Sequence, residues 1–209
     1  MRGMKIIVTC GPSYEPIDEV RRITNFSTGK LGTRLARSLA QAGHEVTCFK
    51  GVGATTQEGA EPARVVPFTT NDDLAAKLQA LENRGGIGAV FHAAALADFK
   101  IERARDGPRK ISSRDGAVTL TLVPSGKLIR ELRDLFPEAK IVGWKYELDG
   151  PREAVLAKAG RQLAENRTDV CVLNGAAYGR GFGACAAGQP PVHLADTAAL
   201  CAWAAALVA

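Results

Sequence analysis

Long hydrophobic runs, paired cysteines and clusters of basic residues are all missing from this chain. No apolar run approaches the ~20 residues that a membrane-spanning helix requires, so a membrane protein is not indicated. The five cysteines contain no C-x-x-C pair, so neither a disulfide framework nor a zinc site is expected. Aromatic residues make up only 6%, and Lys and Arg never form a run of five, which argues against nucleic acid as a partner. Since no cleavable signal follows Met1, we expect a reducing, cytoplasmic compartment.

The length and charge of the chain set its broad class. At 209 residues it can form one well-cored domain, whereas a second full domain would be a tight fit. A net charge of +5 favours anionic ligands, although a merely solubilising surface explains the same balance. We therefore expect a single domain over residues 1–209.

Apolar runs alternate with helical patterns along almost the whole chain. Continuous Val and Ile runs, such as 6–8 and 170–173, suit strands that are buried on both faces. The alternation predicts an α/β fold with a mostly parallel sheet. The expected strands are 5–9, 45–49, 64–66, 88–93, 118–123, 140–144, 170–173 and 192–194, and the expected helices are 30–42, 72–82, 127–135, 151–166 and 197–207.

Two segments interrupt this alternation. Residues 100–116 are dense in charge and turn residues, which is typical of a surface loop or of a basic flap that closes over an anionic ligand. Residues 175–191 are rich in Gly and Ala, and we expect a poorly ordered loop there.

The most informative motif runs from Gly11 to Gly32, between a strand and a helix. Unpaired N–H groups at a helix start bind anions, but the loop fits neither G-x-G-x-x-G nor the phosphate loop. Ser27 or Thr28 would ordinarily cap the helix. Asn25 stands just ahead of the helix, where an amide can donate to a developing oxyanion.

Two further segments follow predicted strands. Small residues and then Asp98 follow the strand expected over 88–93. Asp98 could bind a sugar or a metal, or could simply form a turn or cap a helix. Nothing in the sequence marks His92 as a base. Residues 124–127 and 143–147 follow other strands and should line the same sheet edge. Trp144 could stack on a nucleobase there, although packing is the commoner role of tryptophan.

These segments, in this order, resemble the phosphopantothenoylcysteine synthetase family, which joins cysteine to 4′-phosphopantothenate in coenzyme A biosynthesis. The match runs from Lys5 to about Asn174. It is carried by residues 8–21, 23–29 and 32 of the first motif, by 93–98, by Lys110 and Ile111, and by 169–174.

The resemblance implies a Rossmann-like three-layer α/β/α fold, a homodimer, and a ligase that needs ATP or CTP and Mg²⁺. In the implied reaction the carboxylate of phosphopantothenate attacks the α-phosphate, and the amine of L-cysteine then displaces the nucleotide. Residues 100–116 would be the flap or dimerisation extension. Because no decarboxylase domain precedes the motif, phosphopantothenoylcysteine decarboxylase would be a separate protein acting downstream. The metal ligands are not indicated.

The same resemblance assigns roles to individual residues. Asn25 matches the asparagine that binds phosphopantothenate and stabilises the acyl intermediate, Lys110 matches a flap lysine that neutralises charge, and Arg21 matches a neighbouring arginine; all three would be catalytic. The expected nucleotide-binding residues are Gly11, Ser27, Gly29, Gly32, Ala94, Ala95, Asp98, Lys127, Trp144, Arg161 and Asn174.

The sequence departs from the family's CTP-using bacterial branch at its lysines. Gln162 and Asn166 occupy two lysine positions, with Arg161 as a nearby cation, and the flap reads Lys-Ile-Ser-Ser from Lys110. These features are more similar to the ATP-using eukaryotic branch, so they favour ATP. The missing lysines also leave open a non-catalytic nucleotide-binding homologue.

A nicotinamide- or flavin-dependent reductase on a similar fold is the other alternative. Such an enzyme predicts a tight G-x-G-x-x-G turn and an acidic residue at the end of the second strand. Here that strand ends near Lys50, which favours a phosphate over a ribose hydroxyl.

Overall fold

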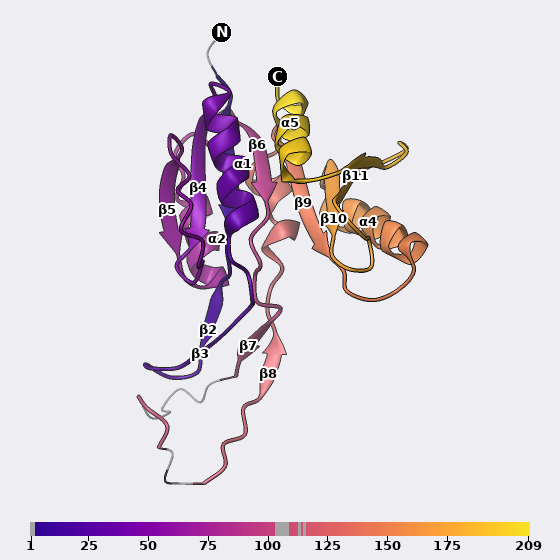
Figure 1. Cartoon of the computed structure of the whole chain (residues 1–209). Helices are drawn as coiled ribbons and strands as arrows, with labels where there is room; N and C mark the ends of the chain where they lie inside the picture. The colour runs from indigo at the N-terminus through magenta and orange to yellow at the C-terminus, as the bar shows by residue number, and fades with distance from the viewer. Residues whose placement is uncertain (1–2, 103–108, 113, 115) are drawn as a thin grey trace.

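The computed structural model describes residues 3–102, 109–112, 114 and 116–209. Its body is an eight-stranded sheet in the order β12-β11-β10-β9-β6-β1-β4-β5 (Figure 1). The strands from β10 to β5 in this order run parallel, whereas β11 pairs antiparallel with both β10 and β12 at one edge. The bounds are β1 (Lys5–Cys10), β4 (Glu45–Gly51), β5 (Arg64–Phe68), β6 (Ile87–His92), β9 (Lys140–Tyr146), β10 (Val170–Asn174), β11 (Phe182–Ala186) and β12 (Val192–Leu194).

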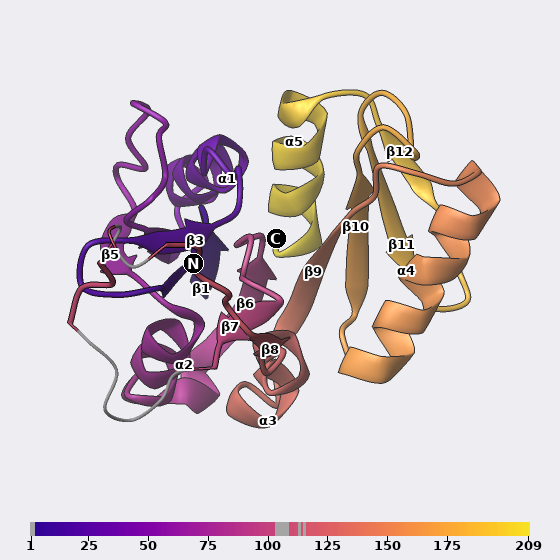
Figure 2. The same ribbon diagram turned by 90° about the horizontal axis from the view of Figure 1, so that it is seen from below.

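Helices cover both faces of the sheet, which gives the domain three layers (Figure 2). One face carries α1 (Lys30–Gln41) and α5 (Thr197–Leu207). The opposite face carries α2 (Asn71–Gln79), α3 (Leu132–Leu135) and α4 (Arg152–Asn166), together with the 3₁₀ turn η2 (Leu128–Arg130). A second 3₁₀ turn, η1 (Arg84–Gly86), precedes β6. This layered arrangement confirms the Rossmann-like fold that the resemblance implied.

The core follows from the alternation of side chains along the central strands. In β1, Ile6 and Val8 pack beneath α1 and α5, whereas Ile7 points to the opposite face and packs with α2. All three side chains are buried, as expected for a strand inside a parallel sheet. The sheet therefore provides a rigid platform whose carboxyl edge carries the long loops.

Two short antiparallel pairs extend from that carboxyl edge and form an arm (Figure 1). One pair is β2 (Tyr14–Pro16) with β3 (Arg22–Thr24), and the other is β7 (Phe99–Ile101) with β8 (Leu122–Pro124). The root of the arm is tied to the body, because the Tyr14 N–H donates to the Thr69 carbonyl at 3.0 Å. The arm is built from the segment that follows β1 and the segment that follows β6.

Comparison with the sequence confirms the mostly parallel sheet and the helices at α1, α2, α4 and α5. The strand expected over 118–123 is wrong, because only Leu122–Pro124 is paired, and in the arm rather than the sheet. The single helix expected over 127–135 is also wrong. A Cβ placed on Gly143 of β9 would lie only 2.8 Å from Ile129 Cδ1, so η2 packs directly against this strand. This tertiary contact overrides the helical pattern of the sequence.

The loop expected to be poorly ordered over 175–191 contains β11, which pairs with β10 and β12. Its small residues reflect packing: a Cβ on Gly183 would lie 2.5 Å from the Tyr178 ring. All five cysteines are free thiols, and the four that are buried pack as small hydrophobic residues. Within the described part of the chain, no helix is long and apolar enough to cross a membrane.

Candidate functional site

The loop between β1 and α1 reaches the sheet edge through glycines. Gly11 (φ 76°) and Gly29 (φ 73°) occupy the left-handed region, where a side chain would be strained. A Cβ on Gly29 would lie 2.8 Å from Ala54 Cβ and 3.3 Å from Gly11 Cα, so the two glycine backbones touch. A Cβ on Gly32 would lie 2.3 Å from Cys10 Cβ, so this glycine lets α1 rest directly on β1. The glycines thus bring the start of α1 to the sheet edge.

The first turn of α1 has an unusual cap. Gly29 is the N-cap residue, so the expectation that Ser27 or Thr28 occupies that position is wrong: the left-handed glycine starts the helix later. Thr28 Oγ1 accepts a hydrogen bond from the Lys30 N–H at 3.3 Å. A helix start whose N-cap has no side chain keeps N–H groups available to an anion. A cavity of about 420 Å³ adjoins it, lined by Thr28, Lys30 and residues 55–58.

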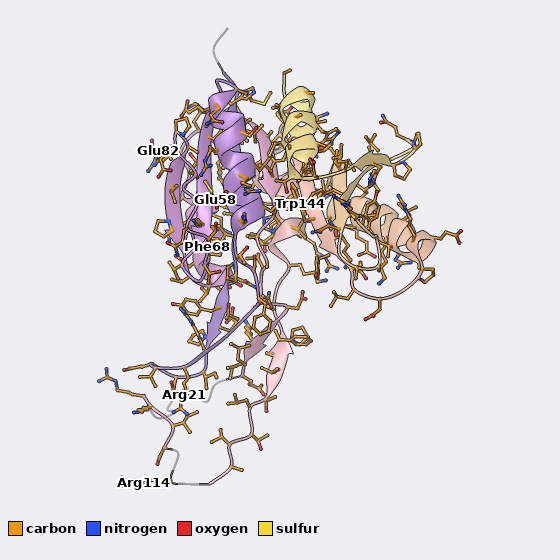
Figure 3. All side chains as sticks on the ribbon, viewed as in Figure 1. Arg21, Glu58, Phe68, Glu82, Arg114 and Trp144 are labelled. Atoms are coloured by element: carbon orange, nitrogen blue, oxygen red, sulfur yellow. The ribbon has the colours of Figure 1, made fainter. Side chains whose placement is uncertain are left out.

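Glu58, which Figure 3 labels, lines this first cavity. Arg34 donates to both carboxylate oxygens at 2.7 Å, and Lys30 Nζ lies 3.3 Å from the same group. The hydrogen bonds from Arg34 lower the pKa of Glu58 to about 2. The carboxylate is therefore ionised and orients both cations at the helix start.

Asn25 lies against the segment that follows β6. Its Nδ2 donates to the carbonyls of Ala95 and Leu96, each at 3.0 Å. Ala95 in turn donates its N–H to the Gly11 carbonyl at 2.9 Å. The structure therefore brings Asn25, Ala95 and Gly11 together and links the asparagine to the glycine loop.

His92 ends β6 beneath this cluster and is buried. Its Nδ1 and Thr9 Oγ1 are 2.9 Å apart, and burial lowers the pKa of the imidazole to about 4. A neutral, buried histidine bonded to a strand hydroxyl is a core residue, in agreement with the expectation that nothing marks it as a base.

Asp18, on the turn between β2 and β3, is a residue that the sequence did not single out. Its side chain is only 1% exposed, although it lies on the arm. Its carboxylate accepts from the N–H groups of Val20, Arg21 and Ile111 and pairs with the Arg21 guanidinium at 2.8 Å. Burial alone would raise the pKa of Asp18, but these bonds bring it below its usual value. Arg21 also donates to the Ile111 carbonyl, so it contacts the segment that carries Lys110.

A second cavity, of about 230 Å³, lies on the face of the sheet that carries α4. It brings Lys127 and Arg161 together, with Gln162 and Asn166 beside them. Arg130, Lys145 and Lys158 add further cations, whereas Glu147 and Glu165 are its acids. The net charge of this lining favours an anion.

Glu147 organises the cations of this second cavity. It forms ion pairs with Lys158 and with Lys145, the latter at 3.4 Å. Burial alone would raise the pKa of Glu147, but the hydrogen bonds from both lysines bring it below its usual value. Lys158 stands one helical turn before Gln162, so the cation absent at 162 is supplied by a neighbour on the same face. Helical spacing was the signal that could have identified it.

The remaining expected residues are more dispersed. Trp144 packs against the core beneath α1 and α5, and its Nε1 is buried without a hydrogen-bond partner among the described residues. Its ring thus lies on the face opposite α4 and the second cavity. The Asp98 carbonyl accepts from the Ser125 N–H at 2.8 Å, and the Asn174 carbonyl from the Glu147 N–H at 2.9 Å. Lys110 is exposed on the arm.

Known proteins match almost the whole chain. Residues 1–193 match the family model described as the DNA/pantothenate metabolism flavoprotein C-terminal domain. The chain is 31% identical over 185 residues to the coenzyme A biosynthesis bifunctional protein CoaBC of Bacillus subtilis (strain 168). That alignment covers 88% of this chain but 43% of the relative, so the chain spans less than half the length of the B. subtilis protein.

Solved structures share the fold. A DNA/pantothenate metabolism flavoprotein from Streptococcus pneumoniae is 24% identical with a TM-score of 0.81, and the alignment covers 96% of both chains. A mutant of Cab2 in complex with phosphopantothenate-cysteine is 21% identical with a TM-score of 0.73, covering 92% of this chain and 80% of that one.

Proposed function

The chain belongs to the family of DNA/pantothenate metabolism flavoprotein C-terminal domains, and we propose that it is a phosphopantothenate–cysteine ligase of coenzyme A biosynthesis. The contact of Asn25 with Ala95, beside the glycine loop, is the observation that carries the proposal. The name of the B. subtilis relative and the compound bound by Cab2 both agree with this activity. The free, mostly buried thiols fit the reducing cytoplasm that we expected.

The proposed reaction has two steps. The carboxylate of phosphopantothenate attacks the α-phosphate of a nucleoside triphosphate, which forms an acyl-nucleotidylate and releases pyrophosphate. The amine of cysteine then attacks the acyl carbon, loses a proton and displaces the nucleoside monophosphate. Both steps bring anions together, so the chain's contribution is positioning and positive charge rather than a side-chain nucleophile. In this assignment Asn25 holds the acyl group and Lys110 neutralises charge.

The nucleotide would use the cations at the sheet edge. The start of α1, with Lys30, suits phosphates, and the second cavity with Lys127, Lys158 and Arg161 offers further positive charge. Among the described residues no group of three or more His, Cys, Asp or Glu could hold a metal ion. Mg²⁺ would therefore be held largely by the nucleotide phosphates and water, which is its usual habit, and it would supply charge neutralisation there.

We propose that two copies of this chain form a homodimer through the arm. The arm carries large apolar side chains that are exposed, whereas monomers usually expose such residues singly. Phe26, beside Asn25, is fully exposed. The other large apolar side chains exposed on the described part of the arm are Val20, Ile23, Phe99, Val118 and Leu122.

Sedimentation equilibrium is expected to give a mass near twice the 22.1 kDa of one chain. Phe26→Ser should weaken the dimer, whereas Val192→Ser, at an exposed site on β12, should leave it unchanged. A fully active wild-type protein that sediments at 22.1 kDa would contradict the dimer.

Pyrophosphate release tests the ligase directly. The wild-type protein should release pyrophosphate only when phosphopantothenate and a nucleoside triphosphate are both present, and form amide product only when cysteine is added. With ATP and CTP side by side, we expect the higher kcat/KM with ATP, since Gln162 and Asn166 replace two lysines of the CTP-using branch. Absence of product with both nucleotides would reject the ligase, and a flavin spectrum or nicotinamide reduction would then favour a reductase.

A further inference from the structure

The arm holds a buried carboxylate whose bonds reach a segment distant in the sequence. Asp18 Oδ1 accepts from the N–H groups of Val20 and Arg21, at 2.9 and 2.8 Å, which closes the turn between β2 and β3. Its Oδ2 accepts from the Ile111 N–H at 3.1 Å and from the Arg21 guanidinium at 2.8 Å. Oδ1 therefore binds the backbone of the turn, while Oδ2 is shared between the Arg21 side chain and the segment that carries Lys110.

The same segment is held on both sides of Lys110. Arg21 Nη2 donates to the Ile111 carbonyl at 2.5 Å, so both backbone groups of Ile111 are bonded to side chains of the turn. On the other side, the Glu19 N–H donates to the Arg109 carbonyl at 3.0 Å, and Arg109 forms an ion pair with Glu19. The backbone on either side of Lys110 is thus docked against the turn, while its own side chain remains exposed.

We infer that Asp18 is a positioning residue for Lys110: with Arg21 it docks residues 109–111 onto the turn and thereby fixes where the lysine projects. The inference rests on the proposed function, in which Lys110 neutralises charge during transfer. The two carboxylates on this turn, those of Asp18 and Glu19, then have different roles. The buried Asp18 carboxylate carries the docking, whereas the exposed Glu19–Arg109 pair contributes little, because surface ion pairs are screened by water.

Asp18→Asn is designed to weaken the docking of residues 109–111 while keeping the turn between β2 and β3 folded. An asparagine can keep an oxygen toward the Val20 and Arg21 N–H groups, but then places an NH₂ group against the Ile111 N–H and the Arg21 guanidinium. Hydrogen bonds to a charged group contribute more to stability than those between neutral groups. Because these bonds hold the Lys110 segment in place, we expect kcat to fall about tenfold or more, with KM for the nucleotide within about twofold. The amide proton of Ile111 should also exchange with solvent about tenfold faster. Glu19→Gln, the matched control, should change kcat by less than about twofold.

A double-mutant cycle shows whether the effect acts through Lys110. In a Lys110→Ala background, Asp18→Asn should lower kcat by less than about twofold further, since the group that it positions is already gone. An equal loss in both backgrounds would overturn the inference, and so would unchanged exchange at Ile111.

A second substitution keeps the test open if Asp18→Asn does not fold. Ile111→Pro removes the same hydrogen bond from the other side and should reproduce the loss and the coupling, whereas Ile111→Ala should not. If the wild-type protein makes no product at all, the proposed function fails, while the exchange of Ile111 still decides whether Asp18 docks this segment.

Discussion

Lys110→Ala is expected to lower kcat for amide formation about a hundredfold or more, with little change in nucleotide KM. The ammonium group is exposed and stands between two residues whose backbone is bonded to the turn at 18–21. In both steps negative charge develops between reactants that are already anionic. Losing one preorganised charge partner of a transition state typically costs a factor of about 100 to 1,000. Single-turnover measurement of pyrophosphate release and of amide formation would show which step slows.

Two further variants make this prediction specific. Lys110→Arg keeps the charge and should retain most of the rate, although the planar guanidinium is not equivalent to an ammonium group. Lys140→Ala, at the exposed start of β9 and so at the amino-terminal end of the parallel strands, removes the same charge away from the candidate site and should leave kcat unchanged. Wild-type kcat in Lys110→Ala would show that this segment is only surface.

The central fold could be predicted from the sequence because its signals are local. Runs such as Ile6–Val8 identify strands buried on both faces, and helices such as α4 carry an apolar stripe. The arm could not be predicted in this way. Its strands are three residues long, and β3 is exposed throughout, so neither periodicity nor burial marks them. The pair β2–β3 is a local hairpin, whereas β7 and β8 pair across the segment that lies between them in the sequence.

The candidate site also has a part that local sequence signals predict and a part that they do not. The glycine loop and the small residues after β6 were identified as motifs, and the structure joins them through Asn25 and Ala95. Lys158 was missed because only the residue at position 162 itself, Gln162, was compared with the family's lysine. On a helix a residue four places earlier lies on the same face, and Lys158 lines the same cavity as Gln162. Asp18 was missed because its partner Ile111 lies 93 positions away. Only the fold shows that this acid belongs with the flap.

Asn25→Asp is expected to leave nucleotide binding within about threefold and to stall the reaction before the amide forms. The asparagine donates two hydrogen bonds, to the carbonyls of Ala95 and Leu96 at 3.0 Å. Aspartate is an acceptor only, so it would place a negative charge beside two carbonyl oxygens and beside the anionic acyl-nucleotidylate. The expected loss in kcat is about a hundredfold to a thousandfold, the scale for losing one preorganised electrostatic contact at a reacting group.

The stalled step distinguishes a role in the chemistry from a role in folding. If Asn25 holds the acyl intermediate, the Asp variant should release pyrophosphate in a burst without forming amide, because the first step outruns the second. Asn83→Asp makes the same change of charge just before η1, at the amino-terminal end of the parallel strands and away from the candidate site. This variant should be fully active. A variant at Asn25 that turns over cysteine at the wild-type rate would remove this residue from the mechanism. Loss of pyrophosphate release with intact nucleotide binding would instead place Asn25 at the first step, where it would orient the attacking carboxylate.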